Sequence, residues 1–162
     1  MNELKRILLV EDSSNDVELT LDALAEIHLA NEIKWLKDGE EVLDYLHLRG
    51  VYSGREPVNP ILILLDLKLP KVDGVQVLQD IRNDPRLRTI PVVVLTSSRE
   101  ESDLASCYAN GANAYVVKPV NFAEFMEAVK AMGVFWAAIN EPPPVRMDDR
   151  RVSQLKKLRQ LT

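Results

Sequence analysis

The sequence predicts an α/β fold in which five strands and five helices alternate around a parallel sheet. Short apolar runs alternate along the chain with longer amphipathic segments, which is the pattern of repeated βα units. Three of the short runs, ILLV, ILILL and VVVL, lack polar alternation, as expected of strands that helices cover on both faces. The chain has 162 residues, 46% of them hydrophobic, and a chain of this length can bury a core without disulfide or metal support.

The expected strands are short and differ in their place in the sheet. The first, third and fourth carry the uninterrupted apolar runs and are expected at the centre. The second, EIKWL, alternates apolar and polar residues and is expected at an edge. In chain order, the five strands span residues 6–10, 32–36, 61–65, 91–95 and 114–117.

The expected helices have apolar residues three and four positions apart. Ser14 or Asn15 can cap the first helix, and Gly50 follows the second. Gly111 follows the fourth, where a left-handed residue often ends a helix. Because βαβ connections are right-handed, the order of elements predicts an open (βα)5 doubly wound sheet with the flavodoxin-like strand order 2-1-3-4-5. The helices span residues 15–29, 40–48, 75–82, 100–110 and 122–139.

Two segments fall outside this alternation. Residues 49–60 form a polar loop before the third strand, which we interpret as a surface insertion. Residues 141–162 form a C-terminal extension that begins with three prolines, a stiff spacer, and continues into a short amphipathic stretch at residues 149–161. We therefore expect a domain of residues 1–140 followed by a proline-led basic arm.

The net charge of the chain is −5, from 20 Lys and Arg against 25 Asp and Glu. Residues 141–162 carry about +3 and the rest of the chain about −8. The acidic body argues against nucleic-acid binding. One cysteine, Cys107, and an N-terminal apolar run of only four residues favour a cytoplasmic protein with no membrane segment.

Polar residues that suit phosphate chemistry follow the expected strands. Because ligands of open α/β sheets bind beyond the carboxyl ends of the strands, these residues should converge at one edge. Clustered carboxylates repel one another unless a cation is present, and oxygen ligands open to water suit Mg²⁺. The ion, an ammonium and a hydroxyl would together hold a phosphate group. The residues are Glu11 and Asp12 after the first strand, Asp66 after the third, Thr96 and Ser97 after the fourth, and Lys118 with Pro119 after the fifth.

Residues 5–139 resemble the receiver domain of two-component response regulators. Each of the matching motifs is short, but together they occur in order and each at a strand end. The resemblance implies a regulator that accepts a phosphoryl group from a histidine kinase and slowly hydrolyses it. The matching residues are Glu11-Asp12, Asp66 with Pro70 and Asp73-Gly74 after it, Thr96-Ser97, and Tyr115 followed by Lys118-Pro119.

The resemblance also assigns a role to each site residue. Asp66 would be the phosphoacceptor and a Mg²⁺ ligand. Asp12 would bind the ion directly, Glu11 mostly through water, and Lys68 through its backbone carbonyl.

A second group of residues would respond to the phosphoryl group. Lys118 would pair with the phosphoryl oxygens. The peptide bond between Lys118 and Pro119 would be cis. Thr96 would swing toward the same oxygens and Tyr115 would move inward behind it, so that helices 100–110 and 122–139 switch together with strand 114–117.

Within this family, three segments resemble the single-domain regulators paired with phytochrome histidine kinases. They are the loop RGVYSGREPVNP, the phosphoacceptor segment LDLKLPKVDG and the VFW near the end of the last helix. Since residues 141–162 are too few to fold a DNA-binding effector domain, we expect a single-domain regulator whose phosphodonor is a bacteriophytochrome. A phosphorelay shuttle or phosphate sink for a different kinase, and a receiver-like interaction domain that is not phosphorylated, are the alternatives.

The last helix carries more apolar residues than one buried stripe requires. Phe122, Phe125, Val129, Met132 and Trp136 form the stripe, and residues 134–139 add further apolar side chains on other faces. Such a surplus indicates an interface. We therefore expect a homodimer, formed before phosphorylation through helices 100–110 and 122–139, strand 114–117 and the C-terminal arm.

Two other classes of protein fit the sequence less well. An aspartyl-phosphate phosphatase would need a second Asp two positions after Asp66, where Lys68 stands. A dinucleotide-binding domain would need a glycine-rich loop after the first strand, where EDSSND would repel phosphate.

Overall fold

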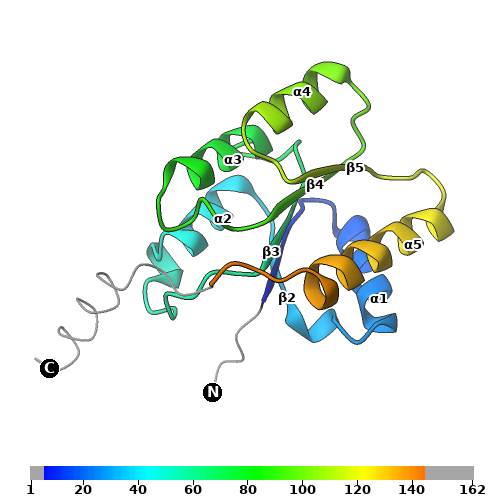
Figure 1. The fold of residues 1–162 in the computed structure, drawn as a ribbon, viewed down its shortest axis with the longest axis horizontal. Coiled ribbons are helices and arrows are strands. Elements are labelled where there is room, and N and C mark those ends of the chain that lie inside the picture. Colours follow the sequence, from blue (N-terminus) through cyan, green and yellow to red (C-terminus); the bar gives the residue numbers. More distant parts are fainter. Residues whose placement is uncertain (1–5, 145–162) are drawn as a thin grey trace, which may run out of the picture.

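The computed structural model describes residues 6–144 and confirms the predicted α/β fold (Figure 1). Five parallel strands form one sheet in the order β2-β1-β3-β4-β5. The order matches the prediction, including the place of β2 at an edge. The stretch 149–161, which the sequence predicts to be amphipathic, lies outside the described residues.

Each strand lies within one residue of its predicted bounds. The strands are β1 (Ile7–Val10), β2 (Ile33–Leu36), β3 (Leu62–Leu65), β4 (Val92–Thr96) and β5 (Ala114–Val117). In the register of the sheet, Val10 of β1 lies beside Leu65 of β3. Glu11 and Asp66 therefore leave neighbouring strands at the same level, which is the main geometric condition for a shared site.

The helices form two layers, one on each face of the sheet (Figure 1). Helices α1 (Ser14–Glu26) and α5 (Phe122–Gly133) cover one face, where side chains such as Leu24 and Val129 pack with Leu9 and Leu64. Helices α2 (Gly39–Leu46), α3 (Gly74–Asn83) and α4 (Glu101–Ala109) cover the other face. The apolar runs of β1, β3 and β4 are buried on both sides, as their composition predicts.

Helix α1 differs from its prediction at both ends. Its N-cap is Ser13, whose hydroxyl accepts a hydrogen bond from the Asp16 N–H at 3.3 Å, rather than Ser14 or Asn15. The helix ends at Glu26 instead of residue 29, because His28 adopts a positive φ of 62° and cannot continue it. A short 3-10 helix, η1 (Ala30–Glu32), then leads into β2.

The end of α4 matches the prediction, and the end of α5 does not. Gly111, directly after the C-cap of α4, has a φ of 92°, as the prediction requires. Helix α5 ends at Gly133, and the last six residues of its predicted range form a π-helix, η3 (Val134–Ile139). Among residues 6–144, no helix has the length and apolar character needed to cross a membrane.

The loop at residues 49–60 lies on the surface but is anchored to α2. It opens with a 3-10 helix, η2 (Gly50–Tyr52), in which Val51 is 92% exposed. Arg55 then folds back so that its guanidinium lies 4.0 Å from the centre of the Tyr45 ring and donates hydrogen bonds to the Tyr45 and Val58 carbonyls. The surface insertion is therefore an ordered part of this face of the domain.

Candidate functional site

The three predicted carboxylates meet at the carboxyl edge of the sheet. Glu11 and Asp12 follow β1, Asp66 follows β3, and one carboxylate oxygen from each lies within 4.8 Å of the others. Glu11 and Asp66 are buried, whereas Asp12 is exposed. The cluster is therefore fixed on one side and open to water on the other.

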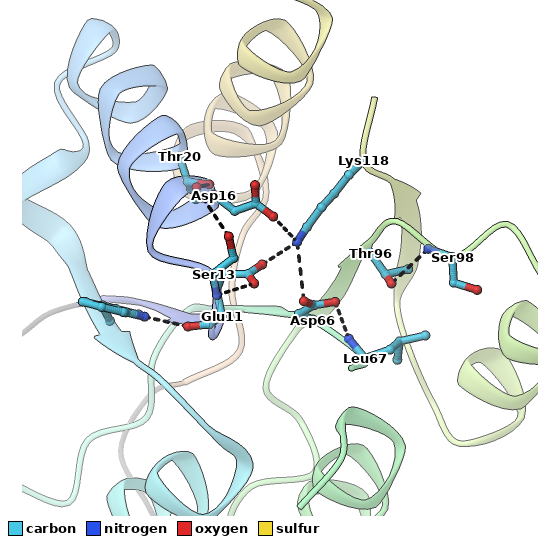
Figure 2. A network of polar contacts seen from close by, with 10 residues as sticks. Glu11, Ser13, Asp16, Thr20, Asp66, Leu67, Thr96, Ser98 and Lys118 are labelled. Atoms are coloured by element: carbon cyan, nitrogen blue, oxygen red, sulfur yellow. Dashed lines mark hydrogen bonds and ion pairs between the residues drawn. The ribbon is translucent and has the colours of Figure 1, made fainter. Parts of the chain in front are cut away.

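Lys118 reaches into this cluster from the end of β5 (Figure 2). Its ammonium lies 2.5 Å from Glu11 Oε2, 2.8 Å from Asp16 Oδ2 and 3.5 Å from Asp66 Oδ2. Burial lowers the pKa of Lys118, but hydrogen bonds to Asp16 and Glu11 and the charge of Asp66 outweigh it, so the pKa lies above its ordinary value. The ammonium is thus a permanent charge in the site.

The Glu11 carboxyl has an unusual affinity for a proton. Burial raises its pKa to about 7, the hydrogen bond from Lys118 opposes the rise, and the charge of Asp66 adds to it. The repulsion between clustered carboxylates, inferred from the sequence, therefore acts at this residue. A cation beside Glu11 and Asp66 would relieve it.

Asp66 is positioned by the start of α3. Its Oδ1 accepts a hydrogen bond from the Leu67 N–H at 2.8 Å, so the side chain turns back on its own backbone. The backbone of Gly74, the first residue of α3, donates to the Leu67 carbonyl at 2.9 Å. Asp73 caps α3 through a reciprocal pair of hydrogen bonds with Gln76.

An open cleft of about 480 Å³ lies beside the carboxylates. Its walls come from the end of β1, the β3–α3 loop, α3 and α4. The exposed side and the cleft leave space for solvent and for a small anionic group next to the cluster. The lining residues are Asp12, Leu67, Lys68, Leu69, Pro70, Asp73, Val75 and Asp103.

The residues at the end of β4 form a second polar network. Thr96 is fully buried, and its hydroxyl accepts a hydrogen bond from the Ser98 N–H at 3.3 Å. The Ser98 hydroxyl donates to Asp103 of α4 at 2.6 Å, and the Tyr115 hydroxyl donates to the Ser98 carbonyl at 3.1 Å. Thr96 and Tyr115, both predicted from the sequence, are thus joined through the loop that connects β4 to α4.

The structure brings in three side chains that the sequence analysis missed. Asp16 contacts Lys118, and Asp103 holds Ser98 while lying 3.7 Å from the Lys68 ammonium. The Trp35 indole donates a hydrogen bond to the Glu11 carbonyl at 2.7 Å. Asp16 had a detectable signal, since the first turn of a helix that directly follows a strand lies at the sheet edge. Asp103 and Trp35 had none, because their contacts depend on side-chain direction.

The predicted cis bond between Lys118 and Pro119 is wrong. Residues 6–144 contain no cis peptide bond, so this bond is trans. The trans isomer is favoured by about 0.5–1 kcal/mol at an X-Pro bond. With this isomer Lys118 already contacts Glu11, Asp16 and Asp66, so no rarer isomer is needed to place its ammonium.

The donor set fits a hard divalent cation. All three side chains offer carboxylate oxygens, and the exposure of Asp12 leaves room for the water ligands that Mg²⁺ retains. Lys68, whose carbonyl the resemblance implies as a further ligand, lines the cleft together with Asp12. Within residues 6–144, no sulfur or imidazole ligand joins this cluster, which distinguishes it from zinc or copper sites.

Comparison with known proteins identifies the family. The family model for the response regulator receiver domain matches residues 7–130 of this chain. The probable methanogenesis regulatory protein FilR2 of Methanothrix harundinacea is 42% identical over 85% of this chain and 86% of its own length. Response regulator Rcp1 of a Synechocystis species is 40% identical over 83% of this chain and 90% of its own length.

Solved structures extend the comparison to nearly the whole chain. The phosphorylated cyanobacterial phytochrome response regulator RcpA has a TM-score of 0.80 and 40% identity, covering 86% of this chain and 99% of its own. The bacteriophytochrome response regulator RtBRR has a TM-score of 0.69 and 53% identity, covering 98% of this chain and 95% of its own. The Mn²⁺-bound form of Rcp1 has a TM-score of 0.79 and 39% identity, covering 85% of this chain and 97% of its own.

Proposed function

Since this chain belongs to the response regulator receiver domain family, we propose that it accepts a phosphoryl group from a histidine kinase on the carboxylate of Asp66. One observation carries the assignment to Asp66. Its carboxylate lies 3.5 Å from the Lys118 ammonium and shares the cluster with Glu11 and Asp12, and the residues that follow it, from Leu67 on, line the open cleft. A nucleophile, a cation and space for the donor therefore coincide at one side chain.

The chemistry is a phosphoryl transfer by nucleophilic attack. A carboxylate oxygen of Asp66 attacks the phosphorus of a phosphohistidine in line, the P–N bond breaks, and the imidazole leaves with its electron pair. The product is an acyl phosphate that water later hydrolyses, which returns Asp66 to its carboxylate. The Lys118 ammonium, already 3.5 Å from Asp66 Oδ2, pairs with the charged phosphoryl oxygens.

A divalent cation completes this site in our proposal. Mg²⁺ held by Asp66, Asp12, Glu11 and the Lys68 carbonyl would neutralise charge on the transferred group. The fit of three carboxylates within 4.8 Å, one of them exposed to water, supports this assignment.

The hydrogen-bond network at the end of β4 responds to the phosphoryl group. Thr96 and Tyr115 both bond to Ser98, one through its N–H and the other through its carbonyl. A hydroxyl that turns from Ser98 toward phosphoryl oxygens would release this loop and allow Tyr115 to move inward. Helices α4 and α5 with strand β5 then form the surface that changes.

We assign the protein to a cytoplasmic two-component pathway with a bacteriophytochrome kinase as the phosphodonor. The similarity to phytochrome regulators over nearly the whole chain supports this assignment. A non-photoreceptor kinase is the second candidate, and it is favoured by the likeness to the methanogenesis regulator FilR2.

A homodimer is the form in which we expect the regulator to act. Apolar side chains are exposed on α4, on the first turn of α5 and along η3, including Leu104, Tyr108, Phe122, Phe135 and Ile139. Phe122 is 59% exposed, so it does not belong to the buried stripe of α5 as the sequence analysis expects. Its exposure enlarges the apolar surface available to a second copy.

The test of the central proposal is a phosphorylation assay. With Mg²⁺ and acetyl phosphate, the protein should gain an acid-stable, base-labile adduct of about 80 Da, the mass of one phosphoryl group, and Asp66→Asn should abolish it. A parallel series of phosphorylated histidine kinases, one of them a bacteriophytochrome, should show the fastest transfer from the bacteriophytochrome.

Asp22→Asn, which removes an exposed carboxylate on α1, is the matched control and should keep the adduct. Absence of an adduct on the unmodified protein, or an undiminished adduct on Asp66→Asn, would overturn the proposal. Faster transfer from an unrelated kinase would overturn only the phytochrome assignment.

A further inference from the structure

Of the three carboxylates that hold the Lys118 ammonium, one lies outside the cluster of Glu11, Asp12 and Asp66. Its three contacts are Glu11, Asp16 and Asp66, which match the three N–H donors of an ammonium. Glu11 and Asp66 belong to the set that could hold a cation, and Asp16 does not. Asp16 comes instead from the first turn of α1, with its Oδ2 2.8 Å from the Lys118 nitrogen (Figure 2).

This arrangement creates a competition for two of the carboxylates. A divalent cation beside Glu11 and Asp66 shares their carboxylates with the ammonium, and the two positive charges repel each other. The Lys118 side chain is only 10% exposed, so water compensates poorly for the partners it loses. The free energy of metal binding therefore depends on what remains to hold the ammonium once the cation has bound.

Resting on the proposed function, we propose that Asp16 is a positioning residue that holds the Lys118 ammonium when a divalent cation occupies Glu11, Asp12 and Asp66. Asp16 keeps the ammonium beside Asp66, ready for the phosphoryl group, while it frees the carboxylates for the cation. In its absence, the ammonium depends wholly on the two carboxylates that it shares with the cation. Asp16 therefore sets the Mg²⁺ concentration at which the site fills.

The side chain of Asp16 is suited to this role. It is 32% exposed, whereas Glu11 and Asp66 are 4% and 11% exposed. A carboxylate that remains in contact with water can bind the ammonium in both states without the cost of burying a lone charge. The backbone of Asp16 is fixed separately, since its N–H binds the Ser13 hydroxyl and its carbonyl accepts from Thr20.

The test is a double-mutant cycle on Mg²⁺ affinity, measured in the absence of any phosphodonor. The chain has two tryptophans, and Trp136→Phe leaves Trp35, whose indole binds the Glu11 carbonyl, as the fluorescent reporter. Mg²⁺ titrations would compare four proteins: this background, Asp16→Asn, Lys118→Met and the double variant. Asp22→Asn, on the exposed side of the same helix, controls for the loss of one distant negative charge.

We expect Asp16→Asn to weaken Mg²⁺ binding about tenfold when Lys118 is present and by about twofold or less when Lys118 is replaced by Met. Asp16→Glu should restore part of the affinity, because it restores the charge. Any effect of Asp16 on the dipole or stability of α1 occurs in both backgrounds and cancels in the cycle.

If Asp16→Asn weakens Mg²⁺ binding equally with and without the Lys118 ammonium, the proposal is overturned. Asp16 would then act on the cation only through the electrostatic field of its charge. Unchanged affinity in Asp16→Asn would overturn it as well. If the protein binds no Mg²⁺ at all, the metal-dependent function itself fails, and this outcome is distinct from a measurable affinity with no coupling.

Discussion

Gly74 allows α3 to pack closely against the backbone of Asp66, the proposed phosphoacceptor. It is the first residue of α3, and a Cβ added there would lie 2.5 Å from the Asp66 carbonyl oxygen and 2.7 Å from the Leu67 Cα. Both neighbours are backbone atoms, which cannot rotate away. Only glycine therefore allows α3 to pack against the segment that carries Asp66.

We predict that Gly74→Ala lowers the free energy of unfolding by about 1–3 kcal/mol, because the helix must move away from the β3–α3 loop. The same movement displaces Asp66 and should slow its phosphorylation by acetyl phosphate. Urea denaturation and the rate of adduct formation measure the two effects.

Gly54→Ala is the matched control, since a Cβ at Gly54 meets nothing within 4 Å. It should change stability by no more than about 0.5 kcal/mol. Equal stability of the two variants would show that α3 tolerates the shift.

Prediction from the sequence succeeds at the residue scale where the backbone alone decides position. Glu11, Asp66 and Lys118 each follow a strand and Thr96 ends one, and the parallel sheet brings all of these strand ends to one edge. The contact of Asp16 with Lys118 depends instead on the rotamers of two long-range partners. The same limit applies to Trp35, whose indole hydrogen bond could not be derived from its place in an edge strand.

At the scale of elements, periodicity predicts the existence of each helix better than its end. Helix α1 stops three residues before its predicted end because His28 adopts a left-handed conformation. A glycine at this position would have indicated such a conformation in the sequence, whereas a histidine does not. Helix α5 changes to a π-helix at Val134 although the apolar pattern continues. In both cases local backbone geometry, and not hydrophobic patterning, determines the boundary.

The end of α3 depends on an ion pair. Asp84, its C-cap, accepts hydrogen bonds from the backbone and the guanidinium of Arg86 and lies 3.5 Å from His47 Nδ1. The hydrogen bond from Arg86 lowers the pKa of the Asp84 carboxyl, more than burial raises it. Because the folded pKa lies below the unfolded one, the stabilisation is present above the unfolded pKa and is lost as pH falls through the folded pKa.

We therefore predict that Asp84→Asn is less stable than the unmodified protein by about 1–2 kcal/mol at pH 7, and that this difference shrinks between pH 5 and pH 2.5. Urea denaturation at half-unit pH steps measures it.

Asp22→Asn serves as the control for the general loss of one negative charge at an exposed position. A difference between Asp84→Asn and the unmodified protein that stays constant down to pH 2.5 would exclude the ion pair as its source.

At the scale of the whole molecule, several of the large exposed apolar side chains gather around β5. Leu104 and Tyr108 lie on α4, Val120 lies just before the N-cap of α5, and Phe122 is the first residue of α5. All four residues of β5, the edge strand between these helices, are only half-buried. An edge strand whose flanking helices expose apolar side chains is unfavourable in contact with water. A second copy of the chain would cover this surface without a separate partner.

We predict that the protein sediments at twice the 18.3 kDa mass of the chain at micromolar concentration, with or without a phosphoryl mimic, and that Phe122→Glu shifts it to the monomer. The substitution places a charge on the apolar surface. It does not disturb α5, because Phe122 is the first helical residue after the Asn121 cap, where an acidic side chain is favourable. Val51→Glu, at an exposed apolar residue of η2, is the control and should leave the dimer intact. A monomeric unmodified protein would contradict dimerisation, and a dimeric Phe122→Glu would move the interface away from the surface of α4, β5 and α5.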